Sequence, residues 1–338
     1  MRENPPRPTP AAASYWERTT YLAPADLLVI GAGITGSSVA LYYKRRFPER
    51  RVVVLEKGWI PAGATTRNAG FACFGSVSEL LDDMTLDAPG TVIARVGRRI
   101  RGLRRLRSEL GDEAIGYEAC GGAEIFTDPE EHARCAERIP WINRAIEEHV
   151  GLAEAYRVGT RNGHPAIECA AEGAIHSGKM MRALHGKLLD AGVEIATGAS
   201  AGSPVLDGPS WRVPIGEGTG RSLQAQRVVV AANGFAGRLL DVPVRPARGL
   251  ILVSRPLPDL RWKGVFHYNK GYVYFRHLPD GRLLLGGARD VDPVTEQTVD
   301  HGSNPAIRAW LTEFAEQVLR VPPADLADME WSGTMGFT

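Results

Sequence analysis

The sequence is poor in cysteine, poor in aromatic residues and nearly balanced in charge. Only four of its 338 residues are cysteine and 7% are aromatic, while 40 basic residues stand against 39 acidic ones. A net charge of +1 gives the whole protein no basic field, so we expect no nucleic-acid partner. No stretch approaches the roughly 18 continuous apolar residues of a membrane-spanning helix.

Residue types that bind metals are scattered along the chain. Its cysteines form no CxxC pair, and its eight histidines form no HExxH or HxH motif. We therefore expect neither a disulfide framework nor a metal site. The first residues lack the apolar core of a secretory signal, which favours a cytoplasmic protein. The length suits two domains with a sizeable core.

A strand–turn–helix–strand unit opens the ordered part of the chain. Residues 1–15 are rich in proline and alanine, and we expect them to form a disordered N-terminal extension. The apolar run DLLVI at 26–30 predicts a buried strand, and a glycine-rich turn follows at 31–36. A helix at 37–47, stopped by Pro48, and a strand RVVVL at 51–55 complete a βαβ unit.

The remaining chain alternates between helical and extended patterns. Residues 59–76 are typical of a loop, the pattern at 78–110 is helical, and 128–150 predict a helix interrupted at Pro140. Further helices are expected at 177–191 and 304–319. Strands are expected at 124–126, 193–196, 211–215, 222–230, 249–254, 271–276 and 282–287.

The glycine-rich turn has the spacing of a dinucleotide-binding motif. Gly31 allows a tight turn, Gly33 lets a pyrophosphate approach the backbone, and Gly36 lets helix and strand pack closely. Glu56 ends the second strand twenty residues later and could accept hydrogen bonds from an adenosine ribose, which argues against a 2′-phosphate. A tight turn without a ligand is the alternative. The cofactor-binding residues expected here also include Ile34, Thr35 and Lys57.

The segment GATTRNAG at 63–70 bears on whether that dinucleotide is NAD or FAD. It resembles the flavin-contacting loop of the D-amino-acid oxidase superfamily, whose usual pattern is GAS-x-RNAG and which includes glycine oxidase, sarcosine oxidase and D-amino-acid dehydrogenase. The alternative is a generic glycine-rich surface loop. The resemblance implies cofactor contacts from Ala64, Thr65, Thr66, Arg67, Asn68, Ala69 and Gly70.

Further motifs extend this resemblance, in order, over most of residues 26–338. IHSGK at 175–179 looks like the second approach to the cofactor domain, and the position that lies over the adenine in relatives matches about Ala201, where valine is usual. VVVAANG at 228–234 resembles a strand and turn beside the dinucleotide and implies contacts from Ala232 and Gly234. The other matches are RG at 248–249, YVYFR at 272–276, DGR at 280–282, GG at 286–287 and WSG at 331–333.

Two departures from the family pattern concern the end of the sequence. Relatives continue from W-x-G into a D-x-x-P segment, a glycine-rich loop and a helix that close the flavin pocket, whereas this sequence stops at Thr338. We expect either a fragment or an incompletely held flavin. Glycine oxidase-like relatives carry a carboxylate-binding arginine where this chain has Met335. Arg276 is a candidate replacement, and a plain surface or strand-edge role is its alternative.

Three more side chains are candidates for the substrate pocket or its surroundings. Tyr272 matches a pocket tyrosine of the relatives, with core packing as the alternative. His267 could act as a pocket acid or base, although a histidine on a strand is usually structural. Cys73 follows the RNAG loop and could lie near the flavin ring, or it could be a buried, inert thiol.

The resemblance implies an α/β fold with a discontinuous, Rossmann-like FAD-binding domain. A mixed α+β substrate domain with an antiparallel sheet would complete it. The FAD-binding domain would comprise residues 24–80, 170–235 and 325–338, and the substrate domain 81–169 and 236–324.

The implied function is FAD-dependent oxidation of an amine or amino acid. A hydride passes to the flavin from the carbon bearing the amine, and the resulting imine hydrolyses. Oxygen or a membrane quinone would reoxidise the flavin, and no metal or protein nucleophile is needed. An NAD-linked dehydrogenase and a non-catalytic or incomplete flavin-binding protein are the alternatives. Seven arginines between Arg95 and Arg107 suggest a solvated helix, or else a patch that binds anionic lipid.

Overall fold

The computed structural model describes residues 12–326 and 328–338, which divide into two compact units. Most of the expected N-terminal extension, residues 1–11, lies outside the described residues. Just after it, Ser14 caps the short helix α1 (Tyr15–Thr19) through reciprocal hydrogen bonds with Glu17. The first unit comprises the chain up to Thr66, Leu184–Arg245 and Gly336–Thr338, and the second comprises Arg67–Ala183 and Pro246–Met335.

The boundaries of these units differ from the domain boundaries expected from the sequence. Three segments expected in the cofactor domain, 67–80, 170–183 and 325–335, belong to the second unit, and the first unit continues beyond 235 to Arg245. Strand pairing explains part of the difference. The short strands β3 (Phe71–Ala72) and β7 (Gly173–Ala174) pair antiparallel with each other, inside the second unit.

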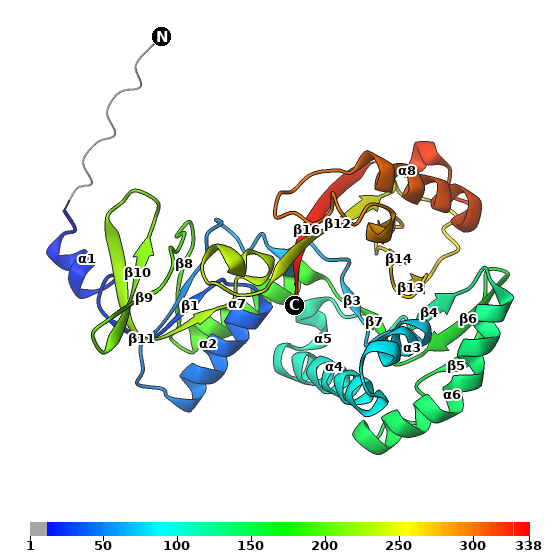
Figure 1. Cartoon of the computed structure of the whole chain (residues 1–338), viewed down its shortest axis with the longest axis horizontal. Coiled ribbons are helices and arrows are strands. Elements are labelled where there is room, and N and C mark those ends of the chain that lie inside the picture. The colour runs from blue at the N-terminus through cyan, green and yellow to red at the C-terminus, as the bar shows by residue number, and fades with distance from the viewer. Residues whose placement is uncertain (1–11, 327) are drawn as a thin grey trace, which may run out of the picture. The chain divides into compact units, whose positions relative to one another are not determined.

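The first unit is built on a six-stranded sheet with the order β8-β2-β1-β11-β10-β9 (Figure 1). Strands β8, β2, β1 and β11 run parallel, and β10 and β9 extend the sheet antiparallel. All but the short, exposed β9 match predicted strands. Their bounds are β1 (Ala25–Ile30), β2 (Val52–Leu55), β8 (Glu194–Ala196), β9 (Val205–Asp207), β10 (Ser210–Ile215) and β11 (Arg221–Val230).

Helix α2 (Ile34–Arg46) connects the two central strands β1 and β2. Its buried residues include Ala40 and Leu41, and it packs against both strands. The helix starts three residues earlier than predicted and ends just before Pro48, as expected. Helix α7 (Ser177–Asp190) precedes β8 and ends before Gly192, whose φ of +78° favours glycine.

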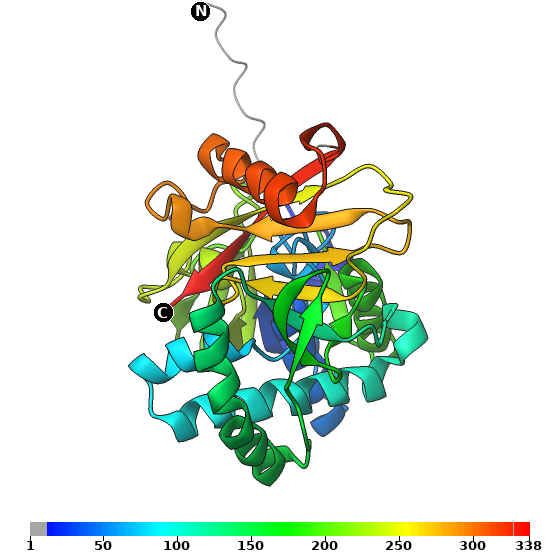
Figure 2. The same cartoon turned by 90° about the vertical axis from the view of Figure 1, so that its right-hand side faces the viewer.

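The second unit is built on an eight-stranded sheet with the order β16-β12-β15-β14-β13-β4-β6-β5 (Figure 2). From β12 to β5 every neighbouring pair is antiparallel except β13 and β4. β5, β6, β13 and β16 were not predicted. The bounds are β4 (Gly122–Ile125), β5 (Arg157–Arg161), β6 (His164–Cys169), β12 (Arg245–Val253), β13 (Val265–Tyr268), β14 (Val273–His277), β15 (Leu283–Gly287) and β16 (Met329–Phe337).

Helix α8 (Pro305–Phe314) lies against this sheet (Figure 2). Its buried residues Ile307, Leu311 and Phe314 join the apolar side chains of β14 and β15 in one core. The predicted helix at 304–319 therefore ends as an α-helix at Phe314, and a single π-helical turn, Ala315–Leu319, follows it.

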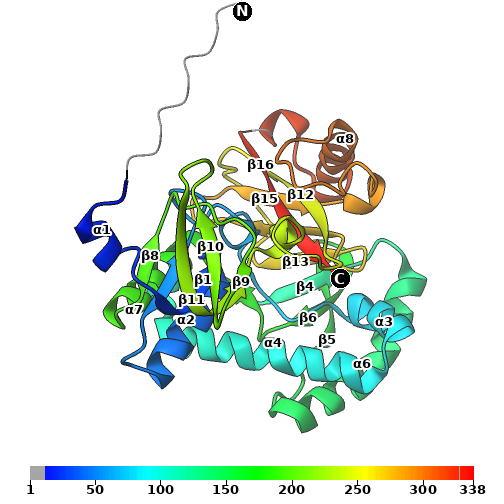
Figure 3. The same cartoon turned by 60° about the vertical axis from the view of Figure 1, so that its left-hand side comes forward.

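Four helices form a second layer within this unit (Figure 3). They are α3 (Val77–Leu86), α4 (Pro89–Leu110), α5 (Asp112–Ile115) and α6 (Pro129–Val150). The helical pattern predicted at 78–110 forms two helices, because Pro89 starts a new helix and disfavours the helical conformation at the residue before it. The predicted interruption at Pro140 is wrong. Helix α6 runs through Pro140, with Ile139, Ile142 and Ile146 buried on both sides of it.

The fold class expected from the sequence is confirmed. One unit has a Rossmann-like βαβ arrangement with a mainly parallel sheet, and the other is a mixed α+β unit with a mainly antiparallel sheet. Among the helices that the structure describes, none is both long and apolar enough to cross a membrane.

Candidate functional site

The glycine-rich turn between β1 and α2 is shaped by close backbone contacts. A Cβ atom at Gly31, where φ is +108°, would lie 2.6 Å from the Ala231 carbonyl oxygen, and one at Gly36 would lie 2.0 Å from the Gly31 carbonyl oxygen. At Gly33 such an atom would meet only Thr65, with Oγ1 at 3.0 Å. Gly31 and Gly36 are thus needed for the close approach of backbone atoms, whereas at Gly33 only the Thr65 side chain lies near.

The start of α2, next to Gly33, is a positively polarised helix end. Its N-cap, Gly33, makes no side-chain capping bond, and the first turn contains no acidic residue. The Ile34 amide donates to Thr65 Oγ1 at 3.2 Å, and Thr35 is exposed. Because helix N-termini favour negative charge, this end of α2 suits a phosphate group.

Glu56 is held in a fixed orientation next to the turn. Its Oε2 accepts from the Ala32 amide at 3.1 Å, and its Oε1 accepts from the Gly58 amide at 2.9 Å. Each carboxylate oxygen keeps a further lone pair, so the half-buried side chain can still accept hydrogen bonds from a pair of ribose hydroxyls. Its neighbour Lys57 is exposed.

The segment GATTRNAG crosses the boundary between the units. Its first half forms a short 3₁₀ turn, Ala64–Thr66, in the first unit. There Thr65 contacts the start of α2, as described above, and the Thr66 hydroxyl donates to the Pro61 carbonyl. Both threonines are half-buried, and Thr65 is the one that contacts the glycine-rich turn.

The second half, Arg67–Gly70, belongs to the second unit and meets the WSG motif. Arg67 Nη1 donates to the Ser332 carbonyl at 2.9 Å, and Trp331 Nε1 donates to the Arg67 carbonyl at 3.1 Å. A Cβ atom at Gly333 would lie 3.1 Å from the Arg67 carbonyl oxygen. Two motifs that are 264 and 265 residues apart in the sequence therefore pack together.

The remaining residues of this loop are fixed by side-chain hydrogen bonds. Asn68 Oδ1 accepts from the Gly70 amide at 2.8 Å and from Ser177 Oγ at 2.6 Å. Ala69 is half-buried, and Gly70 is buried with a φ of +71°. A Cβ atom at Gly70 would lie 2.4 Å from the Ile175 carbonyl oxygen, so the IHSGK motif also packs on this loop.

The last three predicted cofactor-binding residues lie in the first unit. Ala201 forms an isolated bridge with Ile215, Ala232 precedes the 3₁₀ turn Asn233–Arg238, and Gly234 is buried. The sequence did not single out Asn233, which has a φ of +50° and accepts a hydrogen bond from the Gly336 amide at 2.9 Å. Cofactor contacts from the three predicted residues remain predictions.

Of the three predicted substrate residues, Arg276 and His267 are buried and Tyr272 is 40% exposed. Arg276 in β14 is 3% exposed and donates to the carbonyls of Gly70 (2.9 Å) and Ile175 (3.2 Å). It also pairs with Glu118 at 3.3 Å, and burial lowers the pKa of its guanidinium. Neither a surface position nor a free substrate-binding cation describes Arg276, because its contacts join three segments of the second unit.

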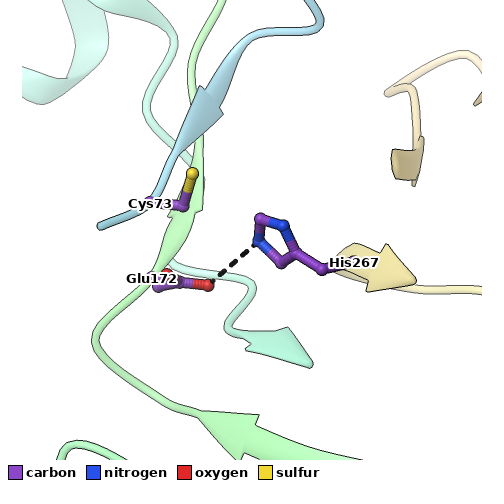
Figure 4. A group of neighbouring side chains, drawn as sticks. All are labelled: Cys73, Glu172 and His267. Carbon is purple, nitrogen blue, oxygen red and sulfur yellow. Dashed lines mark ion pairs between the residues drawn. The ribbon is translucent and has the colours of Figure 1, made fainter. Parts of the chain in front are cut away.

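His267 belongs to a group of three side chains that the sequence did not connect. Cys73 lies just after β3, Glu172 just before β7, and His267 in β13, and their donor atoms all lie within 4.8 Å of one another (Figure 4). His267 Nε2 lies 3.6 Å from Glu172 Oε2 and makes no hydrogen bond. Glu172 was missed because it stands alone among small residues, CAAEGA, with no pattern around it.

The group is electrostatically coupled. Burial raises the pKa of the Cys73 thiol, although His267 beside it acts in the opposite direction. Burial lowers the pKa of His267, but the nearby Cys73 and Glu172 outweigh it and hold that pKa well above its usual range. The protonation states of Cys73 and His267 therefore depend on each other.

The arginines of α4 are largely engaged within the chain. Arg95 pairs with Asp83 at 2.8 Å and also with Asp87, and Arg107 pairs with Asp112 at 2.7 Å. Arg99, Arg104 and Arg105 also have partners in the chain. These contacts reduce the positive charge that an anionic surface would meet.

Comparison with known proteins identifies a matching family and a shared fold. A family model described as "FAD dependent oxidoreductase" (DAO) matches residues 26–338. The bifunctional protein ThiO/ThiG of Synechocystis sp. is 26% identical over 281 residues, which cover 79% of this chain and 39% of that protein. This chain thus spans about two-fifths of that relative's length.

Two solved structures share most of the fold. Glycine oxidase from Geobacillus kaustophilus is 20% identical, with a TM-score of 0.72, over 93% of this chain and 83% of that one. L-alpha-glycerophosphate oxidase from Mycoplasma pneumoniae, with FAD bound, is 14% identical, with a TM-score of 0.73, over 93% of this chain and 84% of that one.

Proposed function

Because this chain belongs to the DAO family of FAD-dependent oxidoreductases, we propose that it oxidises a small amine or amino acid. Its cofactor is FAD, and the NAD-linked alternative is therefore wrong. The observation that carries the proposal is the glycine-rich turn with Glu56, in a chain that matches this family from residue 26 to residue 338.

The residues of the first unit fit FAD. The pyrophosphate would lie at the start of α2, where Gly33 has no side chain and the first turn contains no acidic residue. Glu56 would accept hydrogen bonds from the ribose, since two backbone amides already orient its carboxylate. Thr65 would line the phosphate side, because its hydroxyl is the side-chain group nearest to Gly33.

The chemistry proposed for this chain needs no protein nucleophile. Bound FAD would supply the hydride acceptor for the carbon that carries the amine, and water would hydrolyse the resulting imine to a carbonyl compound and ammonia or an amine. The protein orients the neutral amine and excludes water from it. Oxygen or a quinone takes up the electrons.

Support for an amine or amino acid comes from the motifs and from relatives. The GATTRNAG and WSG motifs resemble those of glycine oxidase-like enzymes, and they pack on each other in the second unit. A glycine oxidase shares the fold over 93% of this chain. A glycerophosphate oxidase shares it equally, so a hydroxyl-bearing substrate is the class to test against.

Tyr272 is the substrate contact that we propose. Its side chain is 40% exposed, and its carbonyl accepts from the Ala288 amide at 2.7 Å, so the backbone fixes its position without the phenol. Tyr272→Phe should lower kcat/KM by about 2- to 10-fold, the equivalent of one hydrogen bond, and leave flavin content unchanged. Tyr268→Phe is the matched control, because Tyr268 bonds Thr127 in the same unit. Equal kinetics for wild type and Tyr272→Phe would make Tyr272 structural.

The decisive experiment is anaerobic reduction of the FAD-loaded protein by a substrate panel. We expect amino acids or amines to bleach the flavin absorption, and glycerol 3-phosphate to leave it unchanged. Bleaching by glycerol 3-phosphate alone would contradict an amine substrate and would support a substrate that is oxidised at a hydroxyl group. Flavin that binds but stays oxidised with every compound, while dithionite still reduces it, would favour the non-catalytic flavin-binding alternative.

A further inference from the structure

We propose that Cys73, Glu172 and His267 bind one zinc ion in the second unit. The three residues offer a thiolate sulfur, a carboxylate oxygen and an imidazole nitrogen, which are the ligand types that zinc takes in proteins. The proposal goes beyond flavin chemistry, because it assigns a site to residues that the oxidation of an amine does not require. All three residues belong to the second unit, so the site needs no residue of the first unit.

The separation of the donor atoms suits a metal better than a hydrogen bond. His267 Nε2 and Glu172 Oε2 lie 3.6 Å apart, beyond hydrogen-bonding distance, and all three donors lie within 4.8 Å of one another. Two N or O ligands, each about 2.1 Å from a tetrahedral zinc, are about 3.4 Å apart, and a sulfur ligand at about 2.3 Å widens that slightly. Small side-chain movements would close the group around one ion.

The strongest single observation is the state of His267. Its Nε2 is buried and has no hydrogen-bond partner, although its side chain is only 9% exposed. A buried polar atom without a partner is unusual, because its desolvation is then uncompensated. Figure 4 shows the His267 ring extending from β13 towards the side where Cys73 and Glu172 lie. A zinc ion bound there would satisfy this nitrogen.

The frame around the group is already organised. Cys73 and Glu172 flank the paired strands β3 and β7, where Ala72 lies opposite Gly173. The second carboxylate oxygen of Glu172, Oε1, accepts from the Phe74 amide at 3.0 Å, which leaves Oε2 for the metal. Such second contacts commonly orient metal-binding carboxylates.

Two neighbouring residues, Gly122 and Phe71, contact the Glu172 and His267 side chains. A Cβ atom at Gly122 in β4 would lie 2.2 Å from Glu172 Oε2, so only glycine lets this carboxylate reach its position. The Phe71 ring stands nearly perpendicular to the His267 ring, at 85°, with the ring centres 5.4 Å apart. These contacts restrict the carboxylate and the imidazole to the orientations that the group needs.

Exposure of the group differs among its members, and this predicts the coordination. Glu172 and His267 are buried, whereas Cys73 is half-buried. We expect three protein ligands with water at the fourth position on the Cys73 side, as in zinc sites that keep one position open. Zinc would bind the thiolate form of Cys73 and displace the thiol proton.

The test measures metal in the FAD-loaded protein, before and after zinc loading and dialysis. We expect one zinc per chain by elemental analysis, and zinc K-edge absorption with one sulfur neighbour at about 2.3 Å. Cys73→Ser and His267→Gln should each reduce zinc retention at least tenfold. Cys120→Ser is the matched control, because Cys120 is a half-buried thiol of the same unit outside the group, and it should retain zinc fully.

Two results would overturn the proposal. A wild-type protein that holds no zinc after loading would reduce the group to an ion pair between His267 and Glu172. Zinc without a sulfur neighbour would place the ion elsewhere. If the variants fail to fold, the wild-type metal content and absorption spectrum still decide the question. Flavin content is measured in the same samples, so a failure of FAD binding is seen separately.

Discussion

The two functional regions of this molecule are built from different parts of the polypeptide. In the first unit the backbone shapes the proposed cofactor site: Gly31 and Gly36 are packed so closely that a Cβ atom would collide with carbonyl oxygens. In the second unit side chains from separate strands make the group of Cys73, Glu172 and His267. Substitutions in the first region should therefore act mainly by steric clashes. Substitutions in the second region should act by changing charge or by leaving buried polar atoms without partners.

The largest effect, on FAD affinity, should come from adding a side chain at Gly33. Gly33→Val would place branched carbons where we propose that the pyrophosphate binds, and we expect FAD affinity to fall at least about 100-fold, equivalent to about 2.7 kcal/mol. Flavin content and a titration with added FAD measure this. Gly63→Val is the control, because a Cβ atom at Gly63 has no neighbour within 4 Å. Normal flavin content in Gly33→Val would show that shape does not govern this region.

A loss of stability should follow from removing the buried charge at Arg276. Arg276→Met removes a buried donor from the Ile175 carbonyl and one of two donors from the Gly70 carbonyl, and it leaves Glu118 with His277 alone. We therefore expect the free energy of unfolding to fall by about 2 kcal/mol, as for the loss of hydrogen bonds from a charged donor. Chemical denaturation measures this change. Arg212→Met is the control, because Arg212 pairs with Asp207 at the surface. An unchanged free energy of unfolding together with a raised KM would instead support a substrate-binding role for Arg276.

A substitution at Glu56 tests whether a charged side chain contributes to FAD affinity in the first unit. Glu56→Ala removes the proposed ribose contacts, and FAD affinity should fall by about 10- to 100-fold, as for one or two hydrogen bonds to a charged acceptor. Isothermal titration of the FAD-free protein measures the affinity. Glu217→Ala, an exposed position of the same unit, should leave affinity unchanged. Equal affinities for wild type and Glu56→Ala would assign Glu56 only to the turn.

The smallest effect should appear at Asp26, at the start of β1. Hydrogen bonds from the Arg51 amide and the Arg50 guanidinium lower the pKa of Asp26 below its ordinary value of 3.8. Its ionised form therefore stabilises the fold above pH 3.8, and this contribution is lost as the pH falls through the lower, folded-state value. Asp26→Asn should cost less than about 1 kcal/mol at pH 7, because Arg50 is half exposed.

Denaturation at pH 7 and at pH 3 distinguishes this effect from a general loss of packing. The difference between wild type and Asp26→Asn should shrink at the lower pH. A difference that stays constant between the two pH values would contradict an ionic contribution from Asp26.

Short-range patterns made much of the first unit predictable. The βαβ unit places Gly31, Gly33, Gly36 and Glu56 within one stretch of chain, so spacing alone indicated a dinucleotide site. The helix ending at Pro48 followed from the restriction that proline places on its predecessor. The resemblance to a family supplied FAD and the mixed α+β second unit, which periodicity alone did not indicate.

Long-range contacts were beyond the reach of sequence patterns. Cys73 and His267 are 194 positions apart, and no spacing rule connects them with Glu172. Strand β13, which carries His267, is only four residues long and was missed. Pro140 misled the prediction because buried isoleucines on both sides stabilise a helix that local propensity alone would break.

The packing of Trp331 and Ser332 on Arg67 has a consequence for the order of folding. Strands β1 and β2 leave the ribosome close together, but Arg67 meets its partners only after 264 further residues have been made. Closing so long a loop is slow, because its entropy must be lost before any contact rewards it. During synthesis, the Arg67–Gly70 segment is therefore expected to gain protection from proteolysis among the last parts of the second unit, well after the helices α3 to α6 have formed.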